Sequence, residues 1–126
     1  MTEETVNQIK WTIHETHPDK VQIAREKLSE IRGIKFLGPD DMDKRSGVLS
    51  FVIDGIHPHD VGSFLDEQGI MIRVGDHCAR PLHKKLKIPA SCRMSFHIYN
   101  TKKDIDRAAE ALQKLVCLFE GRASKK

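Results

Sequence analysis

The residues best suited to chemistry lie close together in one short segment, Arg73-Val-Gly-Asp-His-Cys-Ala-Arg-Pro81. Within it, Cys78 stands in a glycine-containing loop that follows an apolar run. Arg73, His77 and Arg80 are near it in sequence, and nearby cations stabilise a thiolate, which is the reactive form of cysteine. Asp76 works against this because it adds a negative charge. Local composition alone leaves two interpretations open, a reactive thiol or a half-buried cysteine beside solvated charges.

A second candidate is Arg93, which begins a predicted strand. The planar guanidinium group suits a carboxylate, either of a ligand or of a structural Asp or Glu. Sequence context alone favours the structural pair. The other two cysteines, Cys92 and Cys117, fall on apolar patterns, so we predict that both lie in the core.

A zinc site is the competing hypothesis for this region. His77, Cys78, His83 and Cys92 are all suitable ligands, but their spacing matches no common zinc motif. The sequence therefore predicts no metal site. Three cysteines at wide spacing also give no disulfide framework and no CxxC pair.

Length and composition narrow the class of protein further. The chain has 126 residues, which is one domain, and a net charge of +3. That charge, without a basic stripe interleaved with aromatic residues, argues against nucleic-acid binding. No apolar run approaches the ~20 residues of a membrane helix. The polar N-terminus does not resemble a signal peptide, so we expect a cytoplasmic protein.

Apolar periodicity predicts the elements that position these residues. Helices are predicted at 3–14, 19–32 and 58–66, with a short one from Pro81 and a last one that ends at Gly121. Thr101 and Asp104 resemble a capping pair before the last helix. Strands are predicted at 34–37, 48–53, 70–74 and 93–99. This order predicts an α+β fold, a small antiparallel or mixed sheet covered by helices.

Three segments resemble the small domain of SufS-type cysteine desulfurases, within the class V aminotransferases. They run from Ser46 to Asp66, from Gly69 to Leu82 and from Ile88 to Thr101. The resemblance is near-continuous over about 34–120. It implies three parts for the chain: a non-family segment at 1–18, the C-terminal small domain of a fold-type I pyridoxal phosphate enzyme at 19–121, and a basic tail at 122–126.

The resemblance implies a function in sulfur mobilisation for iron–sulfur cluster assembly. The family converts cysteine to alanine and leaves a persulfide on a protein thiol. By resemblance that thiol is Cys78, and Arg93 matches the arginine that grips the substrate carboxylate. Arg73 matches a further arginine of the active site, and His77 matches the histidine before the nucleophile. Asp76 departs from the family, which often has His there.

The larger departure is that no counterpart of the cofactor domain is found. Pyridoxal phosphate supplies the electron sink for this reaction, and side chains do not replace it. We therefore expect the chain to bind no cofactor and to be inactive by itself. One hypothesis is a split enzyme, or selenocysteine lyase, that acts with a separate pyridoxal phosphate domain and a sulfur acceptor of the SufE or SufU type. The alternatives are a sulfur carrier or regulatory module, alone or as a homo-oligomer, and a fragment without a role of its own.

Overall fold

The computed structural model describes residues 2–3, 20–38, 40–41, 47–95 and 101–123. Side chains are described up to residue 121. The predicted helix at 3–14, the basic tail and the end of the predicted strand at 93–99 therefore lie largely outside these residues.

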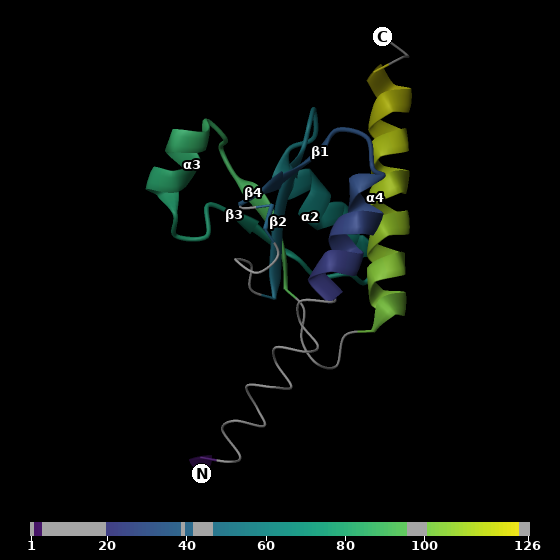
Figure 1. The fold of residues 1–126 in the computed structure, drawn as a ribbon. Coiled ribbons are helices and arrows are strands. Elements are labelled where there is room, and N and C mark those ends of the chain that lie inside the picture. The colour runs from purple at the N-terminus through teal and green to yellow at the C-terminus, as the bar shows by residue number, and fades with distance from the viewer. Residues whose placement is uncertain (1, 4–19, 39, 42–46, 96–100, 124–126) are drawn as a thin grey trace.

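An antiparallel sheet of four strands forms the centre of the described structure (Figure 1). The strands are β1 (Ile34–Leu37), β2 (Val48–Ile53), β3 (Arg73–Gly75) and β4 (Ser91–Ser95). Their order across the sheet is β1-β2-β4-β3, so the two short strands lie at the edges. The predicted α+β class is confirmed, and every neighbouring pair of strands is antiparallel.

Helices lie on both sides of this sheet but do not cover the two faces equally. A helix at 20–29, together with α2 (Pro58–Glu67) and α4 (Lys102–Ala123), covers one face. The short helix α3 (Arg80–Leu86) lies on the opposite side, near the edge formed by β3 (Figure 1). Of the described helices, none has the length and apolar character needed to cross a bilayer.

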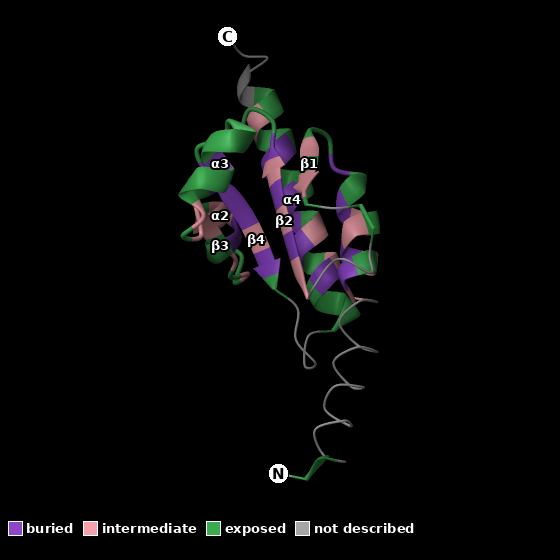
Figure 2. Cartoon of the chain, turned by 60° about the vertical axis from the view of Figure 1, so that its left-hand side comes forward, coloured by how far each residue is buried: buried purple, intermediate pink, exposed green. Residues whose placement is uncertain are grey.

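The hydrophobic core lies between the sheet and the three covering helices. Along β2, Leu49, Phe51 and Ile53 are buried, whereas the residues between them are half-buried (Figure 2). This period of two is what a sheet with one packed face requires. The helices contribute one apolar stripe each, which includes Val21, Ala24, Leu28, Val61, Leu65, Ile105, Leu112 and Leu115.

Several predicted boundaries shift for local reasons. The first helix ends at residue 29 because Glu30 and Ile31 donate to carbonyls only three residues back, which tightens the chain into a turn. Ile70 is not in a strand, because its N–H donates to Leu65 O at 2.8 Å and completes the turn after α2. The last helix continues past Gly121 to Ala123, since one glycine in a helix costs only about 1 kcal/mol.

The capping pair at the start of α4 is confirmed. The Thr101 N–H donates to Asp104 Oδ2 at 2.9 Å. The carboxylate thus satisfies a backbone donor at the helix N-terminus, where its negative charge also complements the helix dipole.

Phe51 offers a direct test of this core. It is fully buried on β2, opposite Phe36 of β1 and Cys92 of β4. We expect Phe51→Ala to lower the free energy of unfolding by about 3–5 kcal/mol, because it leaves a cavity at the centre of the sheet. Urea unfolding measures this. As a control, Gly121→Ala, where an added Cβ meets nothing, should raise stability by about 0.5–1 kcal/mol.

Candidate active site

Two arginines share the face of the sheet that the core does not use. Arg93 of β4 lies directly opposite Arg73 of β3 on one side and opposite Ser50 of β2 on the other. Directly opposed residues of an antiparallel sheet project from the same face. Arg93 is half-buried and Arg73 is exposed, so the pair forms a cationic surface that is open on the Arg73 side.

This cationic surface has unused hydrogen-bonding capacity. Arg93 Nε is buried and has no hydrogen-bond partner among the described residues. A buried donor without a partner costs about 1–3 kcal/mol, and like charges directly opposed across strands destabilise a sheet. An anion on this face would relieve both costs. A carboxylate fits, because its two oxygens match the guanidinium fork.

Cys78 lies on a loop whose backbone is left-handed at several positions. Gly75 has φ 133°, His77 has φ 51° and Cys78 has φ 60°. For residues other than glycine this conformation costs about 1–2 kcal/mol each. Cys78 is exposed, so its thiol is accessible at the surface. The loop follows β3 directly, and Arg73 is the first residue of that strand.

Asp76 organises this loop. Its Oδ1 accepts from the Cys78 N–H at 3.2 Å, and its Oδ2 accepts from Arg80 Nε at 3.2 Å. Asp76 also uses its backbone oxygen to accept from the Ala79 N–H at 2.7 Å. The residue that departs from the family pattern therefore builds the turn that carries Cys78. It also pairs with Arg80, so part of the positive charge near Cys78 is neutralised.

His77 connects the loop to the arginine surface. Its Nε2 donates to Ser91 O at 3.2 Å. Burial lowers the pKa of His77 below the usual 6.5, and the positive charges of Arg93 and His83 lower it further. The hydrogen bond to Ser91 and the charge of Asp76 act in the opposite direction. His77 is therefore neutral at pH 7, and it lies within electrostatic reach of Arg93.

The two remaining cysteines differ from each other. Cys92 is fully buried, and burial raises its pKa to about 12. The core prediction for Cys92 is confirmed, but the same prediction for Cys117 is wrong, because Cys117 is exposed. It follows Leu115 by two residues, which places it about 200° around α4 from that buried side chain.

The zinc hypothesis finds no support in the described residues, where no three His, Cys, Asp or Glu side chains are grouped to hold a metal ion. Cys92 lies among core residues, and its Sγ is 3.9 Å from Pro58 O. His83 has both ring nitrogens engaged, with Nδ1 3.0 Å from Ala79 O and Nε2 2.9 Å from Ser91 Oγ.

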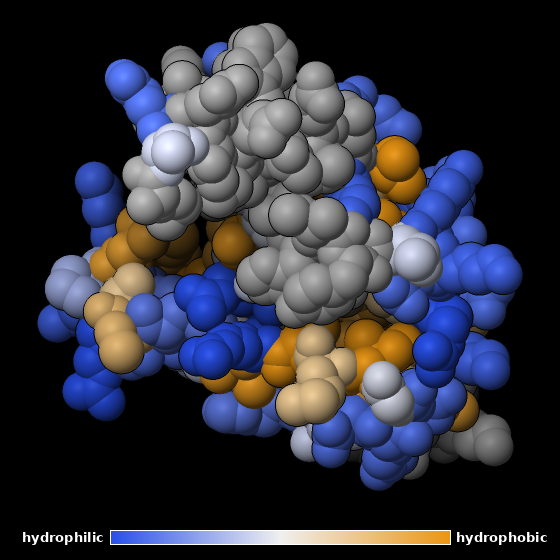
Figure 3. All heavy atoms as spheres, turned by 90° about the horizontal axis from the view of Figure 1, so that it is seen from below, coloured by the Kyte–Doolittle hydropathy of each residue, from blue (hydrophilic) through white to orange (hydrophobic). Residues whose placement is uncertain are grey.

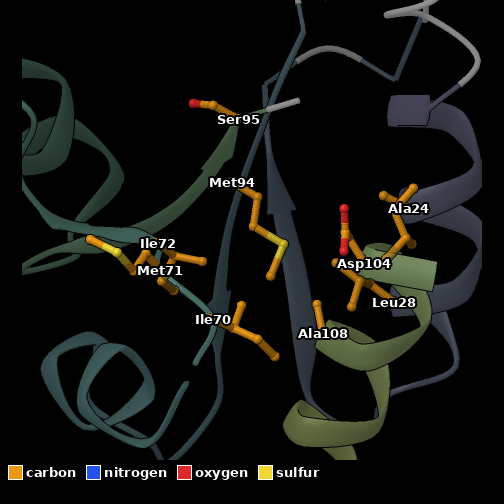
Figure 4. Close-up of a pocket in the computed structure, with 10 residues that line it drawn as sticks. Ala24, Leu28, Ile70, Met71, Ile72, Met94, Ser95, Asp104 and Ala108 are labelled. Carbon is orange, nitrogen blue, oxygen red and sulfur yellow. The ribbon is translucent and has the colours of Figure 1, made fainter. Parts of the chain in front are cut away.

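The structure also contains a small apolar pocket that is separate from these residues. It has a volume of about 100 Å³ and lies between β4, the segment at 70–72 and the helices. Figure 4 shows Met94, Ile70 and Leu28 pointing into the same space, whereas Met71 points away from it. No candidate site residue lines this pocket. Seen from below, apolar side chains reach the surface in patches beside hydrophilic ones (Figure 3).

Two residues of the site were missed as such by sequence reasoning. Ser91 is 2% exposed, and no role was predicted for it. Its backbone oxygen accepts from His77, and its hydroxyl bonds to His83. His83 was considered only as a zinc ligand. The signal that would have found Ser91 is strand alternation, since it precedes Arg93 by two residues and therefore shares its face.

The family is established by comparison with known proteins. The family model for class-V aminotransferases matches residues 4–108. The chain therefore belongs to the aminotransferase class-V family. The matched range begins within the segment 1–18 that the sequence analysis set apart.

Within this family, the similar proteins are cysteine desulfurases. The chain is 42% identical over 99 residues to a probable cysteine desulfurase 2 from Mycobacterium leprae, covering 79% of the chain and 24% of that protein. It is 48% identical over 93 residues to a probable cysteine desulfurase from Halalkalibacterium halodurans, covering 74% and 22%. The apo structure of the Thermococcus onnurineus cysteine desulfurase superposes with a TM-score of 0.80 at 38% identity, covering 83% of this chain and 26% of that one. The chain thus spans about a quarter of the length of these relatives.

The cysteines can be ranked by alkylation. In the folded protein at about pH 8, Cys92 should stay unlabelled, because a pKa of about 12 leaves roughly one thiol in ten thousand ionised and burial excludes the reagent. We expect Cys78 to react first, since its thiol is exposed on a loop that follows the strand of Arg73, followed by Cys117. Limiting iodoacetamide and peptide mass spectrometry measure the rates, and Cys117→Ser serves as the control. Equal labelling of Cys92 would contradict the structure, and faster labelling of Cys117 would contradict the ranking.

The pKa of His77 gives a second test. NMR titration should place it below 6.5, and Arg93→Met should raise it by removing a positive charge. Because the folded state binds this proton less readily than the unfolded state, the contribution to stability is fully present above about pH 6.5 and is lost as pH falls through the lowered pKa. Denaturation curves across this range check the sign. A pKa that does not respond to Arg93→Met would show that the two side chains are not close.

Proposed function

We propose that this chain is the sulfur-accepting and carboxylate-binding part of a SufS-like cysteine desulfurase, and that it works with a separate domain that holds pyridoxal phosphate. The observation that carries the proposal is the open face of the sheet. It holds the half-buried Arg93, whose buried Nε has no partner among the described residues, near the loop of an exposed thiol. The cysteine desulfurases to which the chain is similar support it.

In this proposal Arg93 binds the carboxylate of the substrate cysteine. Its Nε is buried and available, so a carboxylate would gain a strong, oriented, charge-assisted hydrogen bond. Arg73, directly opposite on β3, adds positive charge on the exposed side. Binding at this position fixes the substrate by its carboxylate, which leaves the sulfur-bearing end free to reach the loop of Cys78.

Cys78 takes the sulfur atom. The overall reaction balances as cysteine plus the Cys78 thiol giving alanine plus a Cys78 persulfide. The C–S bond of the substrate breaks, an S–S bond forms at Cys78, and the proton count is unchanged because alanine gains a hydrogen at the carbon that lost sulfur. His77, neutral and fixed to Ser91 O, shapes the site beside the thiol without adding a charge.

The described residues of this chain do not fit the cofactor itself. The family is pyridoxal phosphate-dependent, and the cofactor is held there on a lysine. In the described residues the only buried polar or charged side chains are those of His83 and Ser91. A buried lysine for the cofactor and a buried carboxylate for its ring nitrogen are both lacking in that part of the chain. In this proposal the electron sink comes from a second protein or domain.

A second candidate function is a sulfur carrier or a regulatory module derived from a desulfurase. The exposed Cys78 thiol on an ordered loop favours it, because such a group can accept sulfur from another protein without a cofactor of its own. The persulfide would then pass to an acceptor for iron–sulfur cluster assembly. Both functions use Cys78, but only the split enzyme uses Arg93 to bind free cysteine.

Reconstitution tests the split enzyme. The large domain of a cysteine desulfurase, expressed without its last quarter, is mixed with this chain, pyridoxal phosphate and cysteine. We expect alanine release and one added sulfur atom on Cys78 in the mixture, and neither with the chain alone. Cys78→Ser should abolish both, and Cys117→Ser should change neither. Arg93→Lys should raise KM by about tenfold or more, because lysine lacks the bidentate fork.

The alternatives predict other results. A sulfur carrier would gain sulfur on Cys78 when incubated with an intact desulfurase and cysteine, and Arg93→Lys would leave that transfer unchanged. If no mixture releases alanine and Cys78 never gains sulfur, both proposed functions are wrong.

Titrating the chain alone with pyridoxal phosphate should give no stoichiometric absorption band. A band that is removed by changing one lysine would contradict the proposal that a separate domain holds the cofactor.

A further inference from the structure

Two histidines on either side of Cys78 reach the same residue. His77 directly precedes Cys78 and donates from Nε2 to the backbone oxygen of Ser91 at 3.2 Å. His83 follows five residues after Cys78, and its Nε2 lies 2.9 Å from Ser91 Oγ. The two rings are neighbours, with centroids 6.2 Å apart. Ser91 is thus the common point at which the loop of Cys78 and the helix α3 are attached to the sheet.

The geometry identifies one proton-bearing nitrogen on each ring. His83 Nδ1 lies 3.0 Å from the carbonyl oxygen of Ala79, which only accepts, so Nδ1 carries the proton. In the neutral ring Nε2 then accepts from the Ser91 hydroxyl. His77 Nε2 faces a carbonyl oxygen in the same way and carries its proton there. A continuous chain of hydrogen bonds therefore runs from β4 through Ser91 and His83 to Ala79, the residue after Cys78.

The attachment matters because little else holds this part of the chain. His83 is the only buried residue of α3, and Leu82 and Leu86 are exposed. The helix has no side-chain cap at its N-terminus. A hydrogen bond is directional, whereas apolar packing tolerates small shifts. A helix that docks through one polar side chain therefore keeps a defined position only while that hydrogen bond is formed. The loop before it contains two left-handed residues other than glycine, which an unattached loop would relax.

Ser91 also has a fixed relation to the arginine surface. It lies two residues before Arg93 on β4, so the two side chains share one face of the sheet. Gly75, where β3 ends, is directly opposite Ser91. Strand β4 thus fixes the guanidinium of Arg93 relative to Ser91. The hydrogen bonds of Ser91 fix the loop that carries the thiol of Cys78.

We propose that Ser91 and His83 are positioning residues that fix Cys78 relative to Arg93, with His83 bonded through Nε2 to Ser91 Oγ and through Nδ1 to Ala79 O. This inference rests on the proposed function for its catalytic consequence, but the attachment itself is a property of the chain. The two residues touch neither substrate nor sulfur, and they act through the position of the loop.

The test compares two substitutions of nearly equal shape. Ser91→Thr keeps the hydroxyl, whereas Ser91→Val replaces it with a methyl group. Amide hydrogen exchange is measured by NMR on the isolated chain at Cys78 and Ala79, whose N–H groups bond to Asp76. We expect exchange about tenfold faster in Ser91→Val, the factor that corresponds to one lost hydrogen bond, and near the original rate in Ser91→Thr. Amides of α4 serve as the internal reference.

A second pair of variants covers the case in which Ser91→Val does not fold. His83→Gln keeps a polar group near the position of Nε2, where it can bond to Ser91 Oγ, and His83→Leu removes it. The inference predicts slow exchange at Ala79 in the first and fast exchange in the second. The ¹⁵N shifts of His83 should also show a protonated Nδ1, because that nitrogen faces the carbonyl oxygen of Ala79. An Nδ1 without a proton, or equal exchange within each pair, overturns the inference.

Activity separates this inference from the proposed function. In the reconstituted mixture Ser91→Val should lower kcat for persulfide formation about tenfold and leave KM for cysteine unchanged, since Arg93 stays in place. Ser91→Thr should restore kcat. If the original chain gives no activity, the proposed function fails while the exchange data still decide the attachment. If the chain is active and the two variants, Ser91→Val and Ser91→Thr, have the same kcat and KM, the positioning role is wrong.

Discussion

The alternation of side chains along β4 is the constraint on which the rest of the structure depends. Cys92 and Met94 point into the core, and Ser91 and Arg93 point to the opposite face. A slip of one residue would exchange the two sets, placing a guanidinium among apolar side chains and a thiol at the site. Such a slip is resisted on both sides, because β4 is an inner strand that pairs with β2 and with β3. The core therefore determines where the site residues point.

The loop of Cys78 is held by different interactions from those that hold the sheet beside it. Apolar burial holds the sheet, whereas hydrogen bonds accepted by Asp76 and donated by His77 and His83 hold the loop and α3. Polar attachment is directional, so it specifies a position more narrowly than apolar contact of the same size. Functional sites often break local conformational preferences in this way, and the left-handed backbone at His77 and Cys78 is such a case.

Much of this fold could be predicted because the sheet is amphipathic. The strands at 34–37 and 48–53 were predicted with the bounds that the structure has, since apolar runs between turn residues mark buried strands clearly. β3 was predicted too long, because Ile70 and Ile72 are as β-prone as strand residues but a turn after α2 uses Ile70. Cys117 was placed in the core because α4 is apolar beyond its buried stripe, with Leu118 also exposed.

The site could be predicted only in part. The family resemblance supplied Cys78, Arg93, Arg73 and His77, but it could not supply what holds them. The bonds from Ser91 to two histidines depend on how α3 folds back over β4, and no spacing in the sequence encodes that approach. The role of Asp76 was likewise not predicted. In the sequence a carboxylate near a thiol suggests an electrostatic effect, whereas in the structure its hydrogen bonds form the turn that carries Cys78.

The edges of the sheet have a consequence for handling the chain as a separate protein. β1 has four residues and β3 has three, so the outer strands offer few unpaired backbone groups in a row. Long, flat outer strands act as templates for strands of other molecules, and short ones do not. The short outer strands of the described sheet therefore favour a chain that stays dispersed in solution.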